Sequence, residues 1–207
     1  MERYEARILN LEEYYRLEDE FDRMEDPKER EIRLELLEKV MEAAMDLDVH
    51  ITEFMYTKKR DELEERGIAF TSTEREPIVK AWDEMFDALV SKEEKDSKKF
   101  YSDQFRWHLF SFELLDAVKG DEAKALFDRA EKDELYLFYD YDDRYFCVTG
   151  ASKLTTADID ELCEYGKFDS ADKYFFDPKG KWCYIVTHEI TCGPYFYNFP
   201  VREDPRF

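Results

Sequence analysis

The spacing of apolar residues changes part-way along this chain, and that change limits the possible folds more than any other feature of the sequence. Over residues 11–47, apolar side chains recur every three or four positions and so share one face of a helix. From residue 134 onward, short aromatic and β-branched runs alternate with turn residues, which is typical of strands. The pattern predicts an α+β protein, in which a helical N-terminal half packs on a small antiparallel β-sheet with two helices in the C-terminal half.

The N-terminal half is predicted to hold four helices followed by a charged linker. Asp26-Pro27 separates the first two helices, because Asp is a good N-cap and proline suits the first helical position. Gly67 closes the third helix, and Thr73 with Glu76 forms a capping box for the fourth. The four helices cover residues 11–25, 27–47, 50–66 and 74–91, and the linker covers residues 92–99.

The C-terminal half is predicted to hold two β-hairpins and two short helices. The second hairpin turns at Asp177-Pro178-Lys179-Gly180, which places proline and glycine where a type I turn favours them. The segment FRWHLFSF, residues 105–112, is aromatic and β-prone, although its periodicity does not distinguish a strand from a helix. The hairpins pair residues 134–140 with 144–149 and 173–176 with 181–189, the helices start at Asp121 and at Thr155 or Thr156, and the tail from residue 193 packs on the sheet.

The length of 207 residues suits one domain, or one domain with an added helical part. The first two helices are expected to pack as an antiparallel hairpin, which has the character of an extension. We therefore predict a helical hairpin extension over residues 1–70 and an α+β domain over residues 71–207. A single compact domain is the alternative.

The sequence is strongly acidic, since 52 Asp and Glu against 31 Lys and Arg give a formal net charge of −21. A field of this sign repels nucleic acid and anionic lipid and attracts basic proteins. The short basic stretch Lys58-Lys59-Arg60 is interpreted as solvated surface. We therefore expect a basic protein partner, no direct nucleic-acid binding and no membrane binding.

Other sequence features point to a cytoplasmic protein without a cofactor. No apolar run approaches the roughly 20 residues that span a bilayer, and residues 1–10 lack the apolar core of a signal peptide. In the cytoplasm the four cysteines are expected to be thiols. The glycine-rich phosphate loops and the G-x-S-x-G elbow of hydrolases are absent from the sequence, so no common nucleotide enzyme is indicated.

A metal site is weighed and not favoured. The segment HEITC at residues 188–192 resembles a zinc-protease motif but has Cys where the second His would stand. Cys183, His188 and Cys192, with Cys163 as a fourth, could supply zinc ligands, yet the C-x-x-C knuckle of structural sites is missing. The favoured interpretation is a strand-end histidine and buried cysteines, with no metal.

An enzyme of unlisted type is one alternative. His108, His188 and Glu189 could meet in a pocket and carry out general acid–base chemistry if they lie within hydrogen-bond reach. Cys192 beside either histidine could act as a nucleophile, although nothing in the sequence lowers the pKa of its thiol.

The favoured function is a non-enzymatic, acidic protein-binding module of the immunity or inhibitor kind. It would grip a basic protein through aromatic and acidic side chains, because such mixed surfaces suit protein interfaces. A third possibility is a structural homodimer formed through residues 1–67. The candidate partner-binding residues are Trp107, Asp140, Asp142, Asp143 and Tyr195.

Several short motifs carry a resemblance to a known family. They are Trp107-His108-Leu109-Phe110-Ser111, Gly120-Asp121-Glu122-Ala123, Lys181-Trp182, Thr187-His188-Glu189 and Cys192-Gly193-Pro194. With these motifs, residues 104–199 resemble an uncharacterised bacterial domain family, a domain of unknown function. The resemblance implies a small cytosolic α+β domain, and it makes Trp107, His108, His188 and Glu189 site candidates without assigning them any chemistry.

Overall fold

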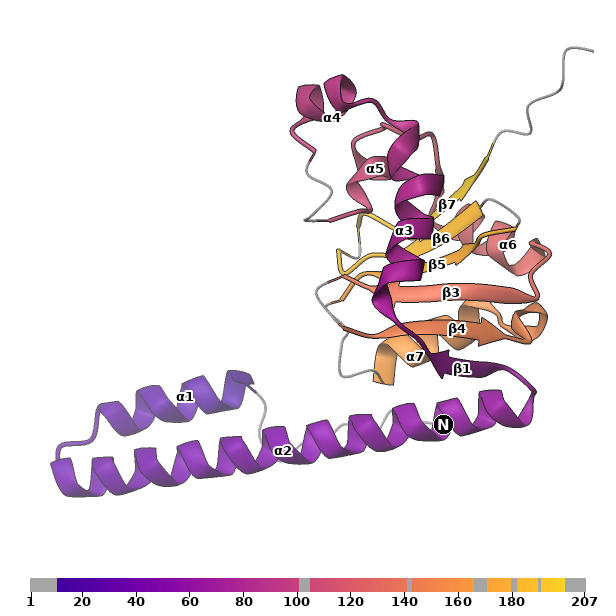
Figure 1. Cartoon of the computed structure of the whole chain (residues 1–207). Coiled ribbons are helices and arrows are strands. Elements are labelled where there is room, and N and C mark those ends of the chain that lie inside the picture. The colour runs from indigo at the N-terminus through magenta and orange to yellow at the C-terminus, as the bar shows by residue number, and fades with distance from the viewer. Residues whose placement is uncertain are drawn as a thin grey trace, which may run out of the picture. The chain divides into compact units, whose positions relative to one another are not determined.

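The computed structural model describes residues 11–100, 105–140, 143–165, 171–179, 182–189 and 191–199. The chain divides into two compact units, Met1–Lys58 with Tyr165–Lys167 and Lys59–Glu164 with Phe168–Phe207. Helices and a fully antiparallel sheet are both present, which confirms the predicted α+β class (Figure 1).

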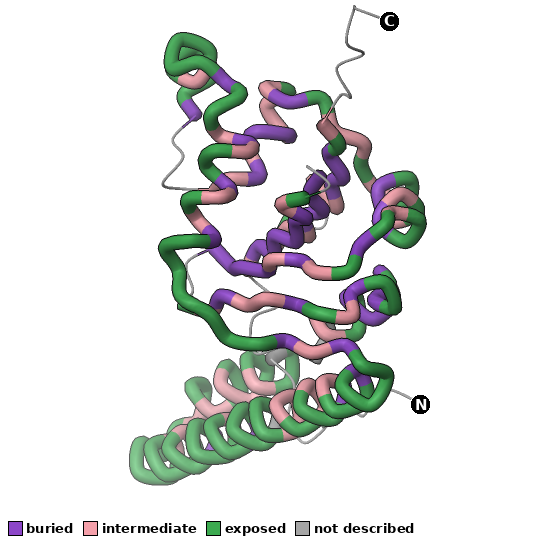
Figure 2. Tube along the Cα trace, turned by 45° about the vertical axis from the view of Figure 1, so that its right-hand side comes forward, coloured by how far each residue is buried: buried purple, intermediate pink, exposed green. Residues whose placement is uncertain are grey.

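Two helices make up the first unit. The helix α1 (Leu11–Asp22) is followed by the long helix α2 (Pro27–Glu65), whose last turns belong to the second unit. Asp26 caps α2 as the sequence predicts, because its carboxylate accepts hydrogen bonds from the backbone N–H groups of Lys28 and Glu29. Leu37 and Ala44 of α2 are buried, whereas most of the other α2 side chains in this unit are exposed (Figure 2).

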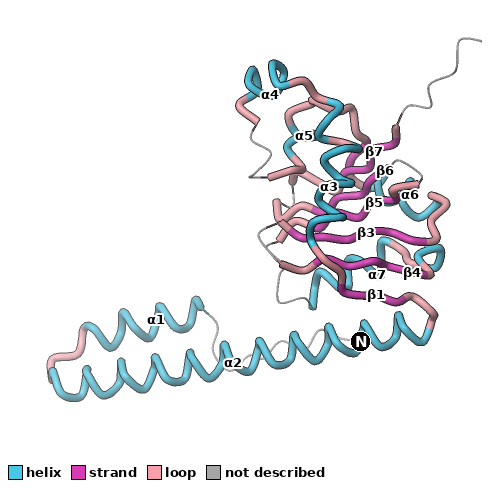
Figure 3. Tube along the Cα trace, viewed as in Figure 1, coloured by secondary structure: helices cyan, strands magenta, loops and turns pink. Residues whose placement is uncertain are grey.

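The second unit is built around one seven-stranded sheet with the order β1-β4-β3-β5-β6-β7-β2 (Figure 3). Both predicted hairpins are confirmed, since β3 pairs with β4 and β5 pairs with β6. The strands are β1 (Ala69–Ser72), β2 (Val118–Lys119), β3 (Glu134–Tyr139), β4 (Tyr145–Thr149), β5 (Lys173–Asp177), β6 (Trp182–Val186) and β7 (Tyr195–Asn198).

Helices cover both faces of this sheet, and each face has its own apolar core. One core packs Trp82 and Phe86 against Phe138 and Phe176, and the other packs Phe127 against strand residues of the opposite face. Because β5 and β6 are covered on both faces, nearly every residue in them is buried. The helices are α3 (Arg75–Met85), α4 (Lys92–Lys98), α5 (His108–Ser111), α6 (Asp121–Arg129) and α7 (Thr156–Tyr165), with single 3₁₀ turns at Asp87–Leu89 and Ala151–Lys153.

Two glycine turns touch each other in the second unit. Gly67 follows α2 and Gly150 follows β4, and both have positive φ, +82° and +66°. A Cβ on Gly150 would lie 2.0 Å from the carbonyl oxygen of Gly67, so no side chain fits there. This close approach joins the end of α2 to the edge of the sheet.

The structure corrects several predicted boundaries in the helical half. Residues 27–47 and 50–66 form one helix, because the residues between them include neither glycine nor proline to stop it. Thr73 does not cap α3, since its backbone N–H donates to Tyr145 and extends the pairing of β1, and Glu74 takes the N-cap position without a side-chain bond. The predicted linker is the helix α4, for which Ser91 and Glu94 form a capping box.

Further corrections fall in the C-terminal half. The aromatic segment at residues 105–112 contains the short helix α5 rather than a strand. Asp121 lies in the first turn of α6, and Gly120 occupies the N-cap position with φ +68°. Thr155 does cap α7 as predicted, because its hydroxyl accepts from the backbone N–H of Asp158 at 3.3 Å. Gly180, which is predicted to complete the turn of the second hairpin, lies outside the described residues.

Candidate functional site

The site begins where the neighbouring strands β5 and β6 meet one end of the sheet. Asp172 comes directly before β5, and His188 follows two residues after β6. Because the strands are antiparallel and Lys173 lies opposite Val186, the two side chains are brought to the same place. One carboxylate oxygen of Asp172 accepts hydrogen bonds from the backbone N–H of His188 at 2.8 Å and from its Nδ1 at 2.9 Å.

Burial and exposure differ sharply within this pair. The side chain of Asp172 is 1 % exposed, whereas that of His188 is 29 % exposed. Since a carboxylate accepts hydrogen bonds, Nδ1 of the imidazole carries the hydrogen, and Nε2 is the nitrogen left to accept or release a proton. A histidine held in one tautomer by a buried carboxylate is the arrangement that orients a general base in many enzymes.

His108 reaches the same region from α5. Its ring stacks on Phe112 with 4.4 Å between ring centroids, and its Nδ1 lies 2.9 Å from the hydroxyl oxygen of Ser111. Burial lowers the pKa of His108, and the negative charges of Glu189 and Asp172 offset this in part. The imidazole is therefore neutral at pH 7.

Two aromatic side chains hold both histidines. The ring of Phe105 lies 5.6 Å from that of His108 and 5.3 Å from that of His188, measured between centroids. The Trp107 ring lies 4.1 Å and 6.1 Å from the same two imidazoles. The histidines that the sequence offered as catalytic candidates therefore gather at one aromatic cluster.

Glu189 and Cys192 form a second hydrogen-bonded pair next to His188. The Cys192 thiol donates to a carboxylate oxygen of Glu189 at 3.0 Å. This hydrogen bond, followed by burial, raises the pKa of the Cys192 thiol. A raised pKa leaves less thiolate at neutral pH, so the geometry does not activate Cys192 as a nucleophile.

The three weak metal candidates do not come together as ligands. Cys183 lies fully buried in the core on the side of the sheet facing α3, and burial raises the pKa of its thiol. His188 is bonded to Asp172, and Cys192 is bonded to Glu189. Among the residues that the structure describes, no three or more His, Cys, Asp or Glu side chains are grouped so that they could hold a metal ion.

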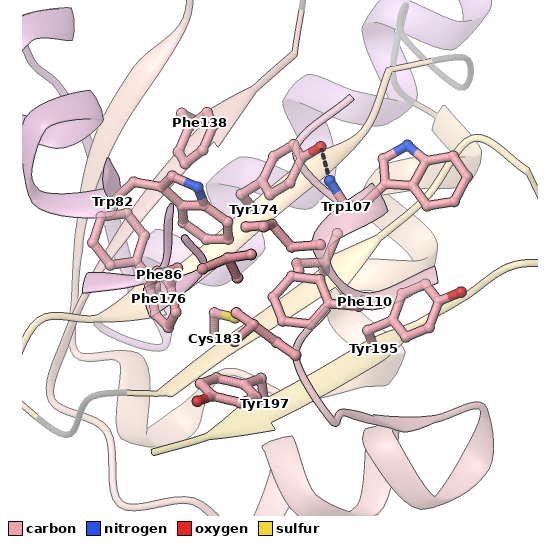
Figure 4. Close-up of a cluster of buried hydrophobic side chains, with 14 of the residues drawn as sticks. Trp82, Phe86, Trp107, Phe110, Phe138, Tyr174, Phe176, Cys183, Tyr195 and Tyr197 are labelled. Carbon is pink, nitrogen blue, oxygen red and sulfur yellow. Dashed lines mark hydrogen bonds between the residues drawn. The ribbon is translucent and has the colours of Figure 1, made fainter. Parts of the chain in front are cut away.

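A buried polar chain fixes the segment that leads into α5. The backbone N–H of Trp107 donates to the Tyr174 hydroxyl at 3.1 Å, and that hydroxyl donates to Asp140 (Figure 4). Asp140 also forms an ion pair with Arg106 at 2.9 Å. Burial raises the pKa of Asp140, and its bonds to Tyr174 and Arg106 offset this only in part. These contacts place the Trp107-His108 pair.

The sequence assigned several of these residues to a partner-binding surface. In the structure Trp107, Asp140 and Tyr195 are 2 %, 4 % and 6 % exposed, so they belong to the interior and offer little contact area. Asp143 is exposed, and Asp142 lies outside the described residues. The sequence could not separate buried from exposed rings here, because aromatic residues occupy both faces of a sheet that is covered on both sides.

A cleft of about 470 Å³ lies beside α5. Ser111, whose hydroxyl lies within hydrogen-bond distance of His108, is one of its lining residues, together with Lys119 and Tyr195. Its volume falls in the range of small-molecule sites. The remaining lining residues are Phe110, Glu113, Leu115, Asp116 and Ala117.

Sequence reasoning did not find every residue of this site. Asp172 was missed because it is one of many acidic residues, and its single distinguishing signal is its place just before a predicted strand. The aromatic segment at residues 105–112 is β-prone by composition, and a strand would not bring its side chains together around His108. In the structure His108 contacts Phe105, Ser111 and Phe112 of this segment.

Comparison with known sequences places the whole site inside one family. The model of a family described as a domain of unknown function, DUF4275, matches residues 49–196. The chain belongs to the DUF4275 family. The resemblance of residues 104–199 to a domain family of unknown function is thereby confirmed, and the match begins further toward the N-terminus, at residue 49. No curated protein and no solved structure matches the chain.

The DUF4275 match divides the chain unevenly. It contains every residue of the histidine cluster, both aromatic cores except for Tyr197 and Phe199, and all seven strands to within the end of β7. The helix α1 and the first part of α2 lie outside it. The chemistry of the candidate site thus belongs to the family domain rather than to the helical hairpin.

Proposed function

We propose that this DUF4275 protein acts on a small polar substrate by general acid–base chemistry, with His188 as the base. The observation that carries the proposal is the buried Asp172 carboxylate, which bonds both the backbone N–H and Nδ1 of a part-exposed histidine. Nε2 of His188 would take a proton from a water molecule or a substrate hydroxyl. Asp172 would stabilise the imidazolium that results.

The surroundings give the other residues supporting roles. His108 is neutral at pH 7 and can hydrogen-bond a substrate through Nε2 while Ser111 holds its Nδ1. The negative charge of Glu189 opposes, in part, the lowering of the His108 pKa by burial. A cleft of the size that a small molecule needs lies next to Ser111, the hydrogen-bond partner of His108, but neither His108 nor His188 is among its lining residues.

The test compares two variants of the site and one control variant with the wild type on two probes, p-nitrophenyl acetate and p-nitrophenyl phosphate. His188→Gln is expected to lower the rate on at least one probe by about 10²–10⁴-fold, because it removes the base. Asp172→Asn keeps the shape but not the charge and is expected to lose activity as well. His50→Gln is the matched control, since His50 lies on the exposed α2 surface.

Equal rates in the wild type and in His188→Gln on both probes would contradict an acid–base site that hydrolyses esters or phosphoesters. The absence of turnover by either protein would contradict it in the same way. Circular dichroism of each variant checks that a loss of rate does not come from loss of fold.

The net charge of −21 favours a second candidate function. An acidic, immunity- or inhibitor-like module would bind a basic protein, and this charge would attract one from a distance. A high negative charge also keeps a protein soluble, so the test must show that one basic protein is bound specifically. A pull-down from the lysate of the native host is expected to retain one basic protein at low salt and less of it at moderate salt. Capture that His188→Gln leaves unchanged separates this function from the acid–base site.

We also propose that the protein works in the cytoplasm. None of the four cysteines forms a disulfide in the structure, which suits a reducing compartment. No helix in the described part of the chain combines the length and the apolar character needed to cross a membrane.

A further inference from the structure

The helix α2 exposes a row of large apolar side chains in the first unit. Five of them share one side of the helix and are between 37 % and 66 % exposed, namely Ile32, Leu36, Val40, Leu47 and Phe54. Isolated exposed apolar residues are ordinary, but a continuous row of this size marks a surface that binds something. We call these five residues together with Ala43 the α2 stripe.

The α2 stripe is distinct from the face that α2 turns toward its own unit's core. Leu37 and Ala44 are buried, whereas Leu36 and Ala43, one position earlier in each case, are exposed. Successive residues point about 100° apart around a helix, so the stripe lies roughly a quarter turn from the buried face. The helix therefore carries two apolar faces, of which the one with Leu37 and Ala44 is buried and the stripe is exposed.

The spacing within the stripe is that of a helix-pairing seam. Val40, Leu47 and Phe54 follow one another at intervals of seven, and Leu36 and Ala43 each stand four positions before the next of them. This is the a/d pattern by which two helices pack side by side. It extends over about three turns on each side of Ala43, which is enough for a weak pair rather than a long coiled coil.

The stripe also borders an apolar groove between α1 and α2. Leu36 and Val40 form part of its wall, so an occupant of the stripe would cover the groove as well. The groove has a volume of about 300 Å³ and is lined by Leu17, Phe21, Arg33, Leu36, Leu37 and Val40.

We propose that a second copy of this chain occupies the α2 stripe, with the two α2 helices antiparallel and crossing near Ala43. In that register Val40 of one copy meets Leu47 of the other, and the small side chain of Ala43 lets the two helices approach closely. The proposal concerns the first unit and does not depend on the acid–base function.

Charge selects the antiparallel arrangement. Residues 42–53 contain acidic residues but neither Lys nor Arg, so a parallel pair would set this acidic segment against itself. Residues 28–39 hold four basic and four acidic side chains, so the antiparallel pair sets a segment without net charge, and not a second acidic one, against the acidic segment of the other copy. Arg33 then faces Glu53. The basic residues of the first segment are Lys28, Arg30, Arg33 and Lys39.

The α2 stripe gives this chain a helix-pairing surface in addition to the family domain. The DUF4275 match begins at residue 49, so most of the stripe lies outside it. The α1–α2 hairpin would then mediate dimerisation, whereas the family domain holds the candidate site.

The first experiment measures the mass of the full chain by sedimentation equilibrium over about 1–100 µM. A dimer is expected, with a Kd of about micromolar order. The double variant Val40→Glu/Leu47→Glu is expected to weaken it at least about 10-fold, because two buried apolar contacts are replaced by charges. Met45→Glu is the matched control, because Met45 is 59 % exposed but lies off the stripe.

A wild-type chain that stays monomeric at about 100 µM would overturn the proposal, and so would a dimer that the stripe variant leaves unchanged. Because all substituted side chains are exposed, loss of folding is not the expected reason for a monomeric variant.

A charge-reversal pair tests the orientation. Arg33→Glu and Glu53→Arg are each expected to weaken the dimer several-fold, and the chain carrying both changes is expected to recover the wild-type Kd. Recovery follows because residue 33 of one copy faces residue 53 of the other in the antiparallel pair. A double variant that is weaker than either single one would rule out this orientation.

Discussion

Two buried tyrosines on neighbouring strands differ in their hydrogen bonding. Tyr174 on β5 donates to Asp140 and accepts from the backbone N–H of Trp107, so its hydroxyl is fully used. Tyr184 on β6 is also completely buried, but its hydroxyl has no hydrogen-bond partner among the described residues. A buried hydroxyl stabilises the fold when it is paired and destabilises it when it is not.

Removing each hydroxyl is therefore expected to have opposite effects. Tyr174→Phe should lower the free energy of unfolding by about 2–3 kcal/mol, since it leaves the buried Asp140 with one partner fewer. Tyr184→Phe should raise it by up to about 1 kcal/mol. Urea unfolding followed by circular dichroism measures both. Changes of the same sign would contradict the hydrogen-bonding pattern described here.

At the scale of elements, an ion-pair network joins the end of α2 to α7 within the second unit. Asp158 of α7 lies 3.0 Å from Nζ of Lys59 and 2.6 Å from Nη1 of Arg66, and Lys59 also pairs with Glu161. Burial alone would raise the pKa of Asp158, but the hydrogen bonds from Arg66 and Lys59 outweigh it and lower the pKa well below its usual range.

This network makes stability depend on acid pH. A carboxyl whose pKa is lowered in the folded chain contributes stability above its unfolded pKa of about 3.9, and loses that contribution as the pH falls further. Asp158→Asn is expected to cost about 2–3 kcal/mol at pH 7 and to flatten the decline below pH 4. The control is Asp160→Asn on the same helix, whose pair with Lys124 is more exposed and should matter by less than about 1 kcal/mol. Urea unfolding between pH 3 and pH 7 measures both, and equal effects would contradict the role of the network.

At the scale of the whole molecule, the excess of negative charge opposes compaction. Many of the exposed ion pairs join residues three or four apart on a single helix, such as Arg33 with Glu29 and Arg16 with Glu20. Pairs of this kind stabilise the fold weakly, and because each joins one positive and one negative group they leave the whole net charge of −21 in place. Self-repulsion is therefore a property of the chain as a whole.

Screening should relieve this repulsion. Raising NaCl from about 20 mM to about 300 mM is expected to raise Tm by about 2–5 °C, because the Debye length falls below the typical spacing between surface charges. Differential scanning calorimetry measures the shift, and glycerol or sucrose at matched osmolality separates ionic screening from osmolyte effects. An unchanged or lower Tm in salt would show that attractive pairs outweigh the repulsion.

The sequence by itself determined the features that depend on near neighbours along the chain. Apolar periodicity predicted α1, the start of α2 at Pro27 and the α+β class, but it divided α2 into two helices. Turn residues predicted the hairpins β3–β4 and β5–β6, because these signals lie within a few residues of each other. The local sequence does not distinguish a strand from a helix in the aromatic segment at residues 105–112, which contains the helix α5 in the structure.

Only the tertiary structure decided which candidate residues meet and which are buried. His188 bonds Asp172, 16 residues away, and Trp107 bonds Tyr174, 67 residues away, so both contacts depend on strand pairing and helix docking rather than on spacing. Burial of Trp107 and Asp140 likewise follows from two cores packed on one sheet. Local sequence patterns determine the helices and strands. The site depends on the assembly of distant segments, because its side chains are buried by, and hydrogen-bonded to, residues that lie far away along the sequence.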